Sequence, residues 1–209
     1  GDDDVLIGTG LPEIDEVHGL LRRGNMFEVV GPPKGGKTTF VAYMVDRCLE
    51  AGLNVAVWPL EGEVDEWTAM IQASMIRKFK SNPMSIDKKR ILERRYQNDF
   101  EKQNVLAARQ ILATDKTRGR LSFITGPAYV EDFIDVMQHH YENINAFDVI
   151  VMDSPILVLS RTGKGKVERI SEAYTRLKTY ITSQMKRKAL ALVTAQLKQE
   201  VIDMLRKNP

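Results

Sequence analysis

A glycine-rich segment holds the residues with the clearest capacity for chemistry. Residues 31–38 read Gly-Pro-Pro-Lys-Gly-Gly-Lys-Thr and fit the pattern G-x-x-x-x-G-K-[ST]. In such a P-loop, backbone N–H groups and the N-terminus of the next helix converge on one point and bind phosphate. Lys37 is expected to reach the β- and γ-phosphates of a nucleoside triphosphate, and the Thr38 hydroxyl to hold Mg²⁺. The predicted phosphate-binding residues are Gly31, Pro32, Pro33, Lys34, Gly35, Gly36, Lys37, Thr38 and Thr39.

The flanks of this segment have the secondary structure that the motif requires. Residues 25–30 are apolar and β-prone, which predicts a strand before the loop. Residues 39–50 carry apolar side chains at helical spacing, which predicts a helix after it. Cys48 lies on the apolar face of this helix, as a buried small hydrophobe would. A chance match in a glycine-rich turn would lack this context, so we favour the phosphate-binding interpretation.

A glutamate follows the second predicted strand. Residues 54–59 are apolar and predict a buried strand, and Glu61 comes just after its end. A carboxylate in this place, beside a P-loop, can orient the water that attacks the γ-phosphate. We therefore predict Glu61 as a catalytic residue. Glu28 and Glu63 are the competing carboxylates.

Two further strand ends carry polar side chains. Residues 147–153 form an apolar run that ends in Asp153, and residues 189–194 lead to Gln196. An ionised aspartate at the end of a buried strand needs a compensating charge, and Mg²⁺ on the nucleotide supplies it. The amide of Gln196 can donate to the γ-phosphate. The catalytic residues are thus predicted to be Lys37, Glu61 and Gln196, and the metal ligands Thr38 and Asp153.

A helical, basic region separates the second strand from a third at residues 121–124. Its first apolar stripe contains Trp67, Met70, Ile71, Met75 and Phe79, and later ones contain Leu92, Tyr96, Phe100, Val105, Leu106, Arg109 and Leu112. Its basic residues are Arg77, Lys78, Lys80, Lys88, Lys89, Arg90, Arg94 and Arg95. Nucleic-acid contact is one interpretation of these charges. We favour a solvated helix face or a subunit contact.

The bulk composition sets broad limits. The 209 residues suffice for one α/β domain, and 30 basic against 28 acidic residues identify no partner. The single cysteine excludes an intrachain disulfide framework. No apolar run approaches the ~18 residues of a membrane span, and the acidic N-terminus is unlike a signal peptide. We expect a single cytoplasmic domain over residues 1–209 that does not enter a membrane.

The segment before the P-loop carries a specific resemblance. Thr9, Gly10 and Asp15 fit Thr-Gly-x-x-x-x-Asp, and Gly19, Leu20 and Gly24 precede the strand and the P-loop. Together with the later motifs, this order resembles the RecA-type ATPase core, and within it the ATPase domain of DnaB-type replicative helicases. Leu11, Ile14, Val17 and Leu20 are spaced for a short amphipathic helix here.

The resemblance implies a RecA-like, doubly wound α/β fold. Its mostly parallel sheet would have helices on both faces and a helical insertion around residues 64–118. Leu60-Glu61 and Leu177-Lys178 match pairs of this family. The chain departs from the family at Leu21, where many members have a second glycine, and at Ala195, where they have serine. Lys198 stands where they usually have arginine.

The resemblance also implies an activity, ATP-driven translocation on single-stranded DNA by a hexameric ring of identical subunits. Cations of the loop at residues 160–169 would meet DNA phosphates in the ring channel, namely Arg161, Lys164 and Lys166, together with Lys198 of a second loop. A plain solvated loop remains the alternative. A RecA- or KaiC-like ATPase that assembles without unwinding, and a non-motor nucleotide-binding partner module, remain alternative functions.

The arginine finger of a RecA core is not found in this sequence. Arg206 comes too early to serve as one. We therefore expect a fragment of a longer protein, or a core that is incomplete as an ATP motor.

Overall fold

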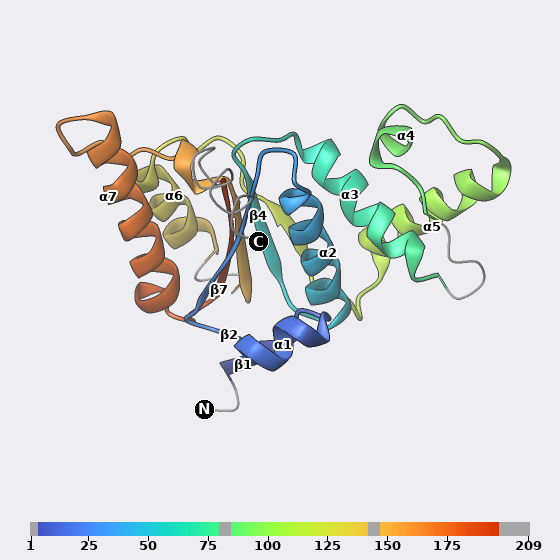
Figure 1. Cartoon of the computed structure of the whole chain (residues 1–209), viewed down its shortest axis with the longest axis horizontal. Helices are drawn as coiled ribbons and strands as arrows, with labels where there is room; N and C mark the ends of the chain where they lie inside the picture. Colours follow the sequence, from blue (N-terminus) through green and yellow to red (C-terminus); the bar gives the residue numbers. More distant parts are fainter. Residues whose placement is uncertain (1–3, 80–84, 142–146, 197–209) are drawn as a thin grey trace, which may run out of the picture.

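Five parallel strands form the central sheet of the protein (Figure 1). The structure, a computed structural model, describes residues 4–79, 85–141 and 147–196. In spatial order the strands are β3 (Met26–Gly31), β7 (Leu190–Gln196), β6 (Val149–Asp153), β4 (Val55–Pro59) and β5 (Leu121–Phe123). All five predicted strands are confirmed, with small shifts of their ends.

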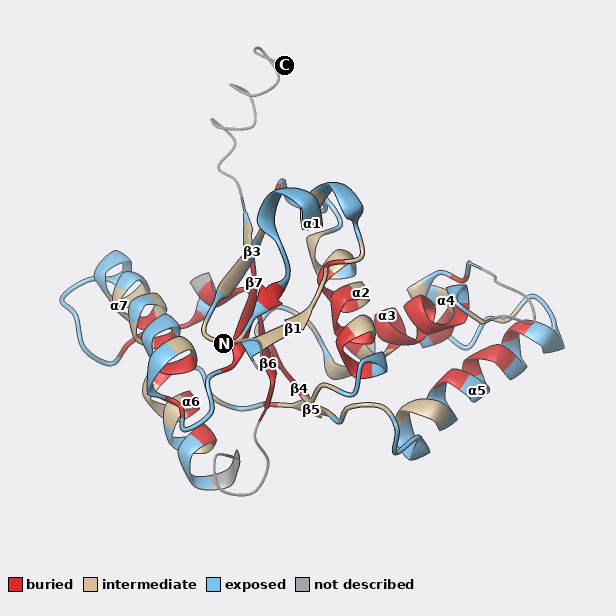
Figure 2. Cartoon of the chain, turned by 90° about the horizontal axis from the view of Figure 1, so that it is seen from below, coloured by how far each residue is buried: buried red, intermediate tan, exposed pale blue. Residues whose placement is uncertain are grey.

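Helices cover both faces of this sheet because side chains alternate along each strand. Val55 and Val57 of β4 pack into one core with α2 (Lys37–Glu50) and α3 (Val64–Arg77). Ala56 and Trp58 pack into the other core with α6 (Val130–Val136) and α7 (Lys166–Thr179). Figure 2 shows the buried residues of the sheet between these helices. The predicted doubly wound α/β fold is therefore confirmed.

Short irregular turns complete the second layer. Turns of π-helix extend α6 and α7 at Met137–Tyr141 and Tyr180–Gln184. A 3₁₀ turn at Pro155–Leu157 follows β6. The rings of Trp58 and Phe133 stack with their centroids 4.2 Å apart, which joins the sheet to α6.

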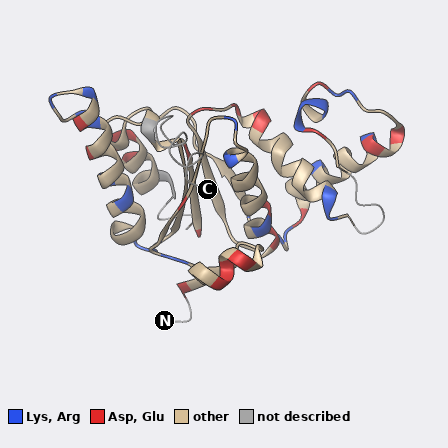
Figure 3. Ribbon diagram, viewed as in Figure 1, with Lys and Arg blue, Asp and Glu red and all other residues tan. Residues whose placement is uncertain are grey.

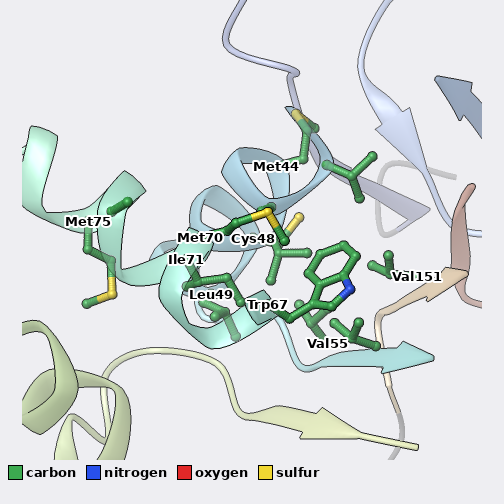
Figure 4. Close-up of a cluster of buried hydrophobic side chains, with 14 of the residues drawn as sticks. Met44, Cys48, Leu49, Val55, Trp67, Met70, Ile71, Met75 and Val151 are labelled. Carbon is green, nitrogen blue, oxygen red and sulfur yellow. The ribbon is translucent and has the colours of Figure 1, made fainter. Parts of the chain in front are cut away.

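The core between α2 and α3 contains the predicted stripe of the basic region. Figure 4 shows Trp67, Met70 and Ile71 of α3 against Cys48 and Leu49 of α2. Cys48 has no exposed surface, and this burial raises the pKa of its thiol to about 12. The thiol is therefore neutral in the folded protein at neutral pH, and its interpretation as a buried hydrophobe is confirmed.

A buried ionic cluster also joins α2 to α3. Asp46 of α2 has no exposed surface, and its carboxylate accepts from Ser74 Oγ at 2.7 Å. Arg118 and Lys78 lie 2.7 and 2.8 Å from the same carboxylate. A carboxylate on the apolar side of a helix is stable only with such partners. The cluster therefore sets how α3 lies against the helix that begins at the P-loop.

We expect Asp46→Ala to destabilise the fold by about 3–5 kcal/mol, because it leaves the largely buried Arg118 guanidinium without its carboxylate. Glu50→Ala is the matched control, since Glu50 pairs with the same Lys78 but is half exposed. Glu50→Ala should lower the free energy of unfolding by about 1 kcal/mol or less. Urea unfolding of the wild type and the two variants measures both free-energy changes. Equal losses of stability in the two variants would contradict a buried ionic cluster at Asp46.

Beyond α3 the insertion continues through α4 (Lys88–Leu92) and α5 (Asp99–Thr114), which project away from the sheet (Figure 1). The prediction that Leu106 and Arg109 belong to the inward face of α5 is wrong. Leu106 is 44% exposed, and Arg109 is also exposed. The buried positions are instead Glu101, Asn104, Val105 and Ala108. Glu101 is buried because it accepts from Gln97 N and pairs with Arg90, so a polar residue occupies the inward face.

Of the seven described basic residues from Arg77 to Arg95, five are paired with carboxylates. Those with an ion pair are Lys78, Lys88, Lys89, Arg90 and Arg95. Figure 3 shows acidic and basic residues interspersed along the ribbon of this lobe. Lys80 lies outside the described residues. This pairing supports the interpretation of a solvated helix face over nucleic-acid contact.

The N-terminal segment forms a small unit that the sequence analysis describes only in part. The predicted helix is present as α1 (Pro12–His18), but none of its residues is buried and Val17 is 77% exposed. The expected inward apolar face is therefore wrong. Strands β1 (Val5–Ile7) and β2 (Leu21–Arg22) flank α1 and pair antiparallel, which the sequence analysis does not predict.

The Thr-Gly-x-x-x-x-Asp motif has a structural role in this unit. Asp15 accepts hydrogen bonds from the Thr9 backbone N–H and hydroxyl, both at 2.6 Å, and from the Gly10 N–H at 3.1 Å. The hydrogen bond from the Thr9 hydroxyl is the main cause of the lowered pKa of Asp15. The motif thus closes the turn ahead of α1. Within the described residues no helix has the length and apolar character that crossing a bilayer demands.

Candidate active site

The strand order brings the predicted catalytic residues to one edge of the sheet. In a parallel sheet all carboxyl ends meet at the same edge, where ligands of α/β folds bind. Gly31 at the end of β3 pairs with Gln196 at the end of β7. Asp153 at the end of β6 pairs with Pro59 of β4, two residues before Glu61. The P-loop, Gln196, Asp153 and Glu61 therefore follow one another along this edge.

The P-loop is an exposed turn that leads directly into α2. Residues 32–36 are exposed between the buried Gly31 and the first turn of α2. Gly36 adopts a left-handed φ of +81°, although a Cβ there would meet no atom within 4 Å. Glycine is thus favoured here for its backbone freedom and not for space. The Lys37 ammonium donates to the Pro32 carbonyl oxygen at 2.6 Å, so its charge lies over the loop.

Asp153 connects the P-loop to the sheet. Its side chain is 4% exposed and accepts from the hydroxyl of Thr38 at 3.1 Å and from that of Thr194 at 2.6 Å. No lysine, arginine or histidine of the described residues forms an ion pair with it. A buried carboxylate without a cationic partner is costly, and a bound cation removes that cost.

This donor set fits Mg²⁺. The ion prefers oxygen ligands and is usually held by one or two carboxylates together with nucleotide phosphates and water. Asp153 and Thr38 supply one carboxylate and one hydroxyl beside the exposed loop. Those two residues would hold the metal.

Glu61 is fixed through its backbone while its carboxylate is exposed. The Glu61 N–H donates to the Asp153 carbonyl oxygen at 2.9 Å. Gly62 lies against the buried Trp67, whose Nε1 would be 3.6 Å from a Cβ on that glycine. The main chain at Glu61 is therefore held from two sides, while the residue itself is exposed.

The other carboxylates near these strands lie at different places in the fold. Glu63 is the residue before the first turn of α3, and its carbonyl accepts from Trp67 N. Glu28 lies in the middle of β3 and pairs with Val193, away from the carboxyl edge. Asp148, at the other end of β6, pairs with Arg23 and accepts from Asn54 N at 2.7 Å. Of these carboxylates, Glu61 is the one bonded through its backbone to the Asp153 main chain.

Thr194 is a site residue that the sequence analysis does not identify. It is buried at the end of β7 and donates to the Asp153 carboxylate. The sequence feature that could have revealed Thr194 is its polar side chain within an otherwise apolar strand. Which carboxylate it contacts follows from the β6–β7 register and not from its place in the sequence.

Side-chain contacts anchor one cation of the loop before α7. Arg161 pairs with Asp132 at 2.7 Å and lies 4.8 Å from the Tyr129 ring centroid. The loop is also shorter than predicted, because α7 begins at Lys166. Lys164 and Lys166 are exposed and form no ion pair with a described residue. The ribbon of Figure 3 marks basic residues on this loop, and Lys198 lies outside the described residues.

Comparison with known proteins finds similarity in structure and not in sequence. No protein-family profile and no curated protein sequence matches the chain. A solved DnaB-like replicative helicase, studied with its interactions with primase, superposes with a TM-score of 0.73 at 16% identity, over 99% of this chain and 47% of that chain. A solved ATPase domain superposes with a TM-score of 0.72 at 15% identity, over 99% of this chain and 70% of that one.

The chain thus spans about half the length of that helicase. At these identities the likeness concerns the fold. The parallel sheet, its helices and the edge that carries the P-loop agree with this likeness. The chain therefore has the RecA-like fold of the ATPase domains of DnaB-like helicases.

Proposed function

We propose that this chain is the ATP-hydrolysing motor domain of a ring-forming DNA helicase of the DnaB-like type. The observation that carries the proposal is the hydrogen bond between the Thr38 hydroxyl and the Asp153 carboxylate, which joins the P-loop to the end of β6. Glu61 and Gln196 flank this contact at the same edge. Because the chain spans about half of the helicase that it resembles, the activity of the complete protein is part of this proposal.

The side chains have separate roles in the proposed reaction. The backbone N–H groups of the loop bind the phosphates, and Lys37 stabilises the negative charge that develops on the γ-phosphoryl oxygens. Thr38 and Asp153 would hold Mg²⁺, which would help to neutralise the charge of the bound triphosphate. Glu61 orients the attacking water, since phosphoryl transfer needs mainly positioning and electrostatic stabilisation.

Gln196 would couple hydrolysis to movement. Its side chain is exposed at the end of β7, and its backbone pairs with Gly31 at the start of the P-loop. An amide in that place can donate to the γ-phosphate and lose this bond after hydrolysis.

Lys164 and Lys166 are the cations that we propose for contact with single-stranded DNA. We expect Lys164→Ala/Lys166→Ala to lower the affinity for DNA and to flatten its dependence on salt, by about 0.7 in log–log slope for each DNA phosphate that the variant no longer neutralises. Arg161→Ala should have a smaller effect, because Asp132 already neutralises that guanidinium. Fluorescence anisotropy of a labelled oligonucleotide over a salt series measures the slopes.

Lys178→Ala is the control for this measurement, because Lys178 is an exposed lysine on the same helix but away from the loop. It should retain the wild-type slope. If the double variant also retains that slope, the loop is a solvated surface and does not contact DNA.

The function itself is tested by the mass of the assembly and by unwinding. We expect a hexamer in the presence of ATP, Mg²⁺ and single-stranded DNA, and strand displacement on a forked duplex. Hydrolysis with assembly but without displacement would favour a RecA- or KaiC-like ATPase. Nucleotide binding with neither would favour a non-motor partner module.

A further inference from the structure

A cleft within the helical insertion lies outside the site at the strand ends. It measures about 400 Å³, which falls within the ~300–1,000 Å³ typical of small-molecule sites. Its walls come from α3, from the end of α4 and the chain just after it, and from α5. These three helices form the lobe that projects from the sheet in Figure 1. None of the described residues that line the cleft belongs to the P-loop or to a strand end.

A buried side-chain amide lines this cleft without a partner. Gln72 of α3 is 2% exposed, yet its side chain forms no hydrogen bond with a described residue. Buried polar groups are normally hydrogen-bonded, because the loss of their bonds to water is costly when nothing replaces them. The amide of Gln72 therefore has donors and an acceptor that a ligand in the cleft can satisfy.

Two arginines of the cleft are also without partners. Arg94 follows α4 and Arg109 lies on α5, and both are exposed and line the cleft. Neither guanidinium forms an ion pair with a described carboxylate, whereas five other cations of the insertion do. A guanidinium presents its N–H groups as a planar fork that matches the oxygens of a phosphate or a carboxylate. Two of them on one cleft indicate an anionic ligand.

The backbone at Arg94 agrees with a role for its side chain. Arg94 has a φ of 53°, in the left-handed region, just beyond the last turn of α4. Glycine or asparagine is usual at such a position, because a larger side chain is disfavoured there. The chain thus carries a cation beside the cleft where glycine would fit the turn with less strain.

The remaining groups of the cleft favour a ligand that is more than a simple anion. Asp65 is exposed at the start of α3, forms no ion pair with a described residue, and can accept from a hydroxyl or an amino group. Ala69 and Ile91 are buried and add apolar atoms to the wall. Two arginines against one aspartate leave the lining positive. A small molecule with an anionic group and free hydroxyls fits this distribution.

We propose that the cleft between α3, α4 and α5 binds a small phosphate ester with free hydroxyl groups, such as a sugar phosphate. Its phosphate would lie on Arg94 and Arg109, since a phosphate has enough charge and terminal oxygens for both guanidinium groups. Gln72 would donate to an oxygen of the ligand, and Asp65 would accept from a hydroxyl. The inference goes beyond the proposed ATPase, because the P-loop takes no part in it.

Ribose 5-phosphate is the probe for this site, with Mg²⁺–ATPγS present to occupy the P-loop. We expect the wild type to bind the probe with a Kd of about 1 mM or tighter, the range open to ligands of this size. Arg109→Gln should weaken binding by on the order of tenfold or more, because a charge-assisted contact to the phosphate is lost. Titrations followed by phosphorus NMR of the probe measure both affinities.

Arg95→Gln is the matched control for this substitution. It removes the same charge from an exposed arginine next to Arg94, but Arg95 pairs with Glu93 and does not line the cleft. Its affinity for the probe should equal that of the wild type. If the wild type does not bind ribose 5-phosphate, or if Arg95→Gln and Arg109→Gln weaken binding equally, the proposal is wrong.

Gln72→Leu gives a second readout that needs no measurement of affinity. Leucine fills similar space without polar atoms, so the variant without ligand should resist urea better than the wild type does. Ribose 5-phosphate should raise the urea midpoint of the wild type and raise that of Gln72→Leu less. A less stable variant, or an equal rise in both proteins, would remove Gln72 from the site. Inorganic phosphate that binds as tightly as ribose 5-phosphate would overturn recognition of the hydroxyls.

Discussion

Lys37→Ala is expected to lower the turnover of ATP by on the order of 10²–10³, the usual effect of removing one preorganised donor from a transition state. The Lys37 ammonium lies over the P-loop, bonded to the Pro32 carbonyl, with no carboxylate of the described residues in an ion pair with it. Its charge is therefore available to the γ-phosphoryl oxygens, where negative charge gathers during transfer. Phosphate release at saturating Mg²⁺–ATP measures the effect.

Lys102→Ala is the control for this substitution. Lys102 is an exposed lysine of α5, remote from the P-loop in the insertion, so its loss changes the net charge equally without touching the site. The control should turn over ATP at the wild-type rate. Wild-type turnover in Lys37→Ala would show that residues 31–38 do not form the hydrolysis site.

Glu61→Gln should stop hydrolysis while leaving ATP binding intact. The amide keeps the size of the side chain but orients and polarises water less well, and losses of about 10²–10⁴ are typical when such a group is removed. The backbone bond from Glu61 N to the Asp153 carbonyl does not involve the side chain, so the loop should keep its conformation. Binding of a fluorescent ATP analogue and release of phosphate separate the two effects.

Glu63→Gln is the matched comparison, since Glu63 is also an exposed glutamate, two residues further along. Glu63 is the residue just before α3, and its side chain makes no capping hydrogen bond to that helix. We expect near wild-type turnover in this variant. The reverse result, with Glu63→Gln inactive and Glu61→Gln active, would move the catalytic role to Glu63.

Much of the fold is readable from local pattern. A strand buried on both faces must be apolar throughout, so residues 54–59 and 147–153 are recognisable without knowledge of their neighbours. The P-loop is likewise local, because its glycines, lysine and threonine act within one strand–loop–helix unit. The apolar strands and the P-loop motif together led to the prediction that the polar residues at the strand ends belong to the site.

Local pattern fails where a distant residue decides burial. Asp46 lies on the inward side of α2, where periodicity alone predicts an apolar residue, and Arg118 makes its burial possible from 72 residues away. Val17 and Leu106 show the converse case. Each has the spacing of an inward apolar residue, yet no described element covers it. Periodicity indicates a face, but only packing determines what lies against it.

Local sequence patterns were enough to predict the five strands, and to identify the P-loop motif and the polar residues at the strand ends as candidates for a site. They were enough because burial and phosphate binding each impose strict demands on adjacent residues. The strand order, by contrast, came from the three-dimensional structure, and it places Thr194 on Asp153 and Gln196 beside Gly31. The same holds for the neutralisation of Arg161 by Asp132 and for the cleft between α3, α4 and α5. These features depend on contacts between segments far apart in the chain, and local composition does not encode which segments meet.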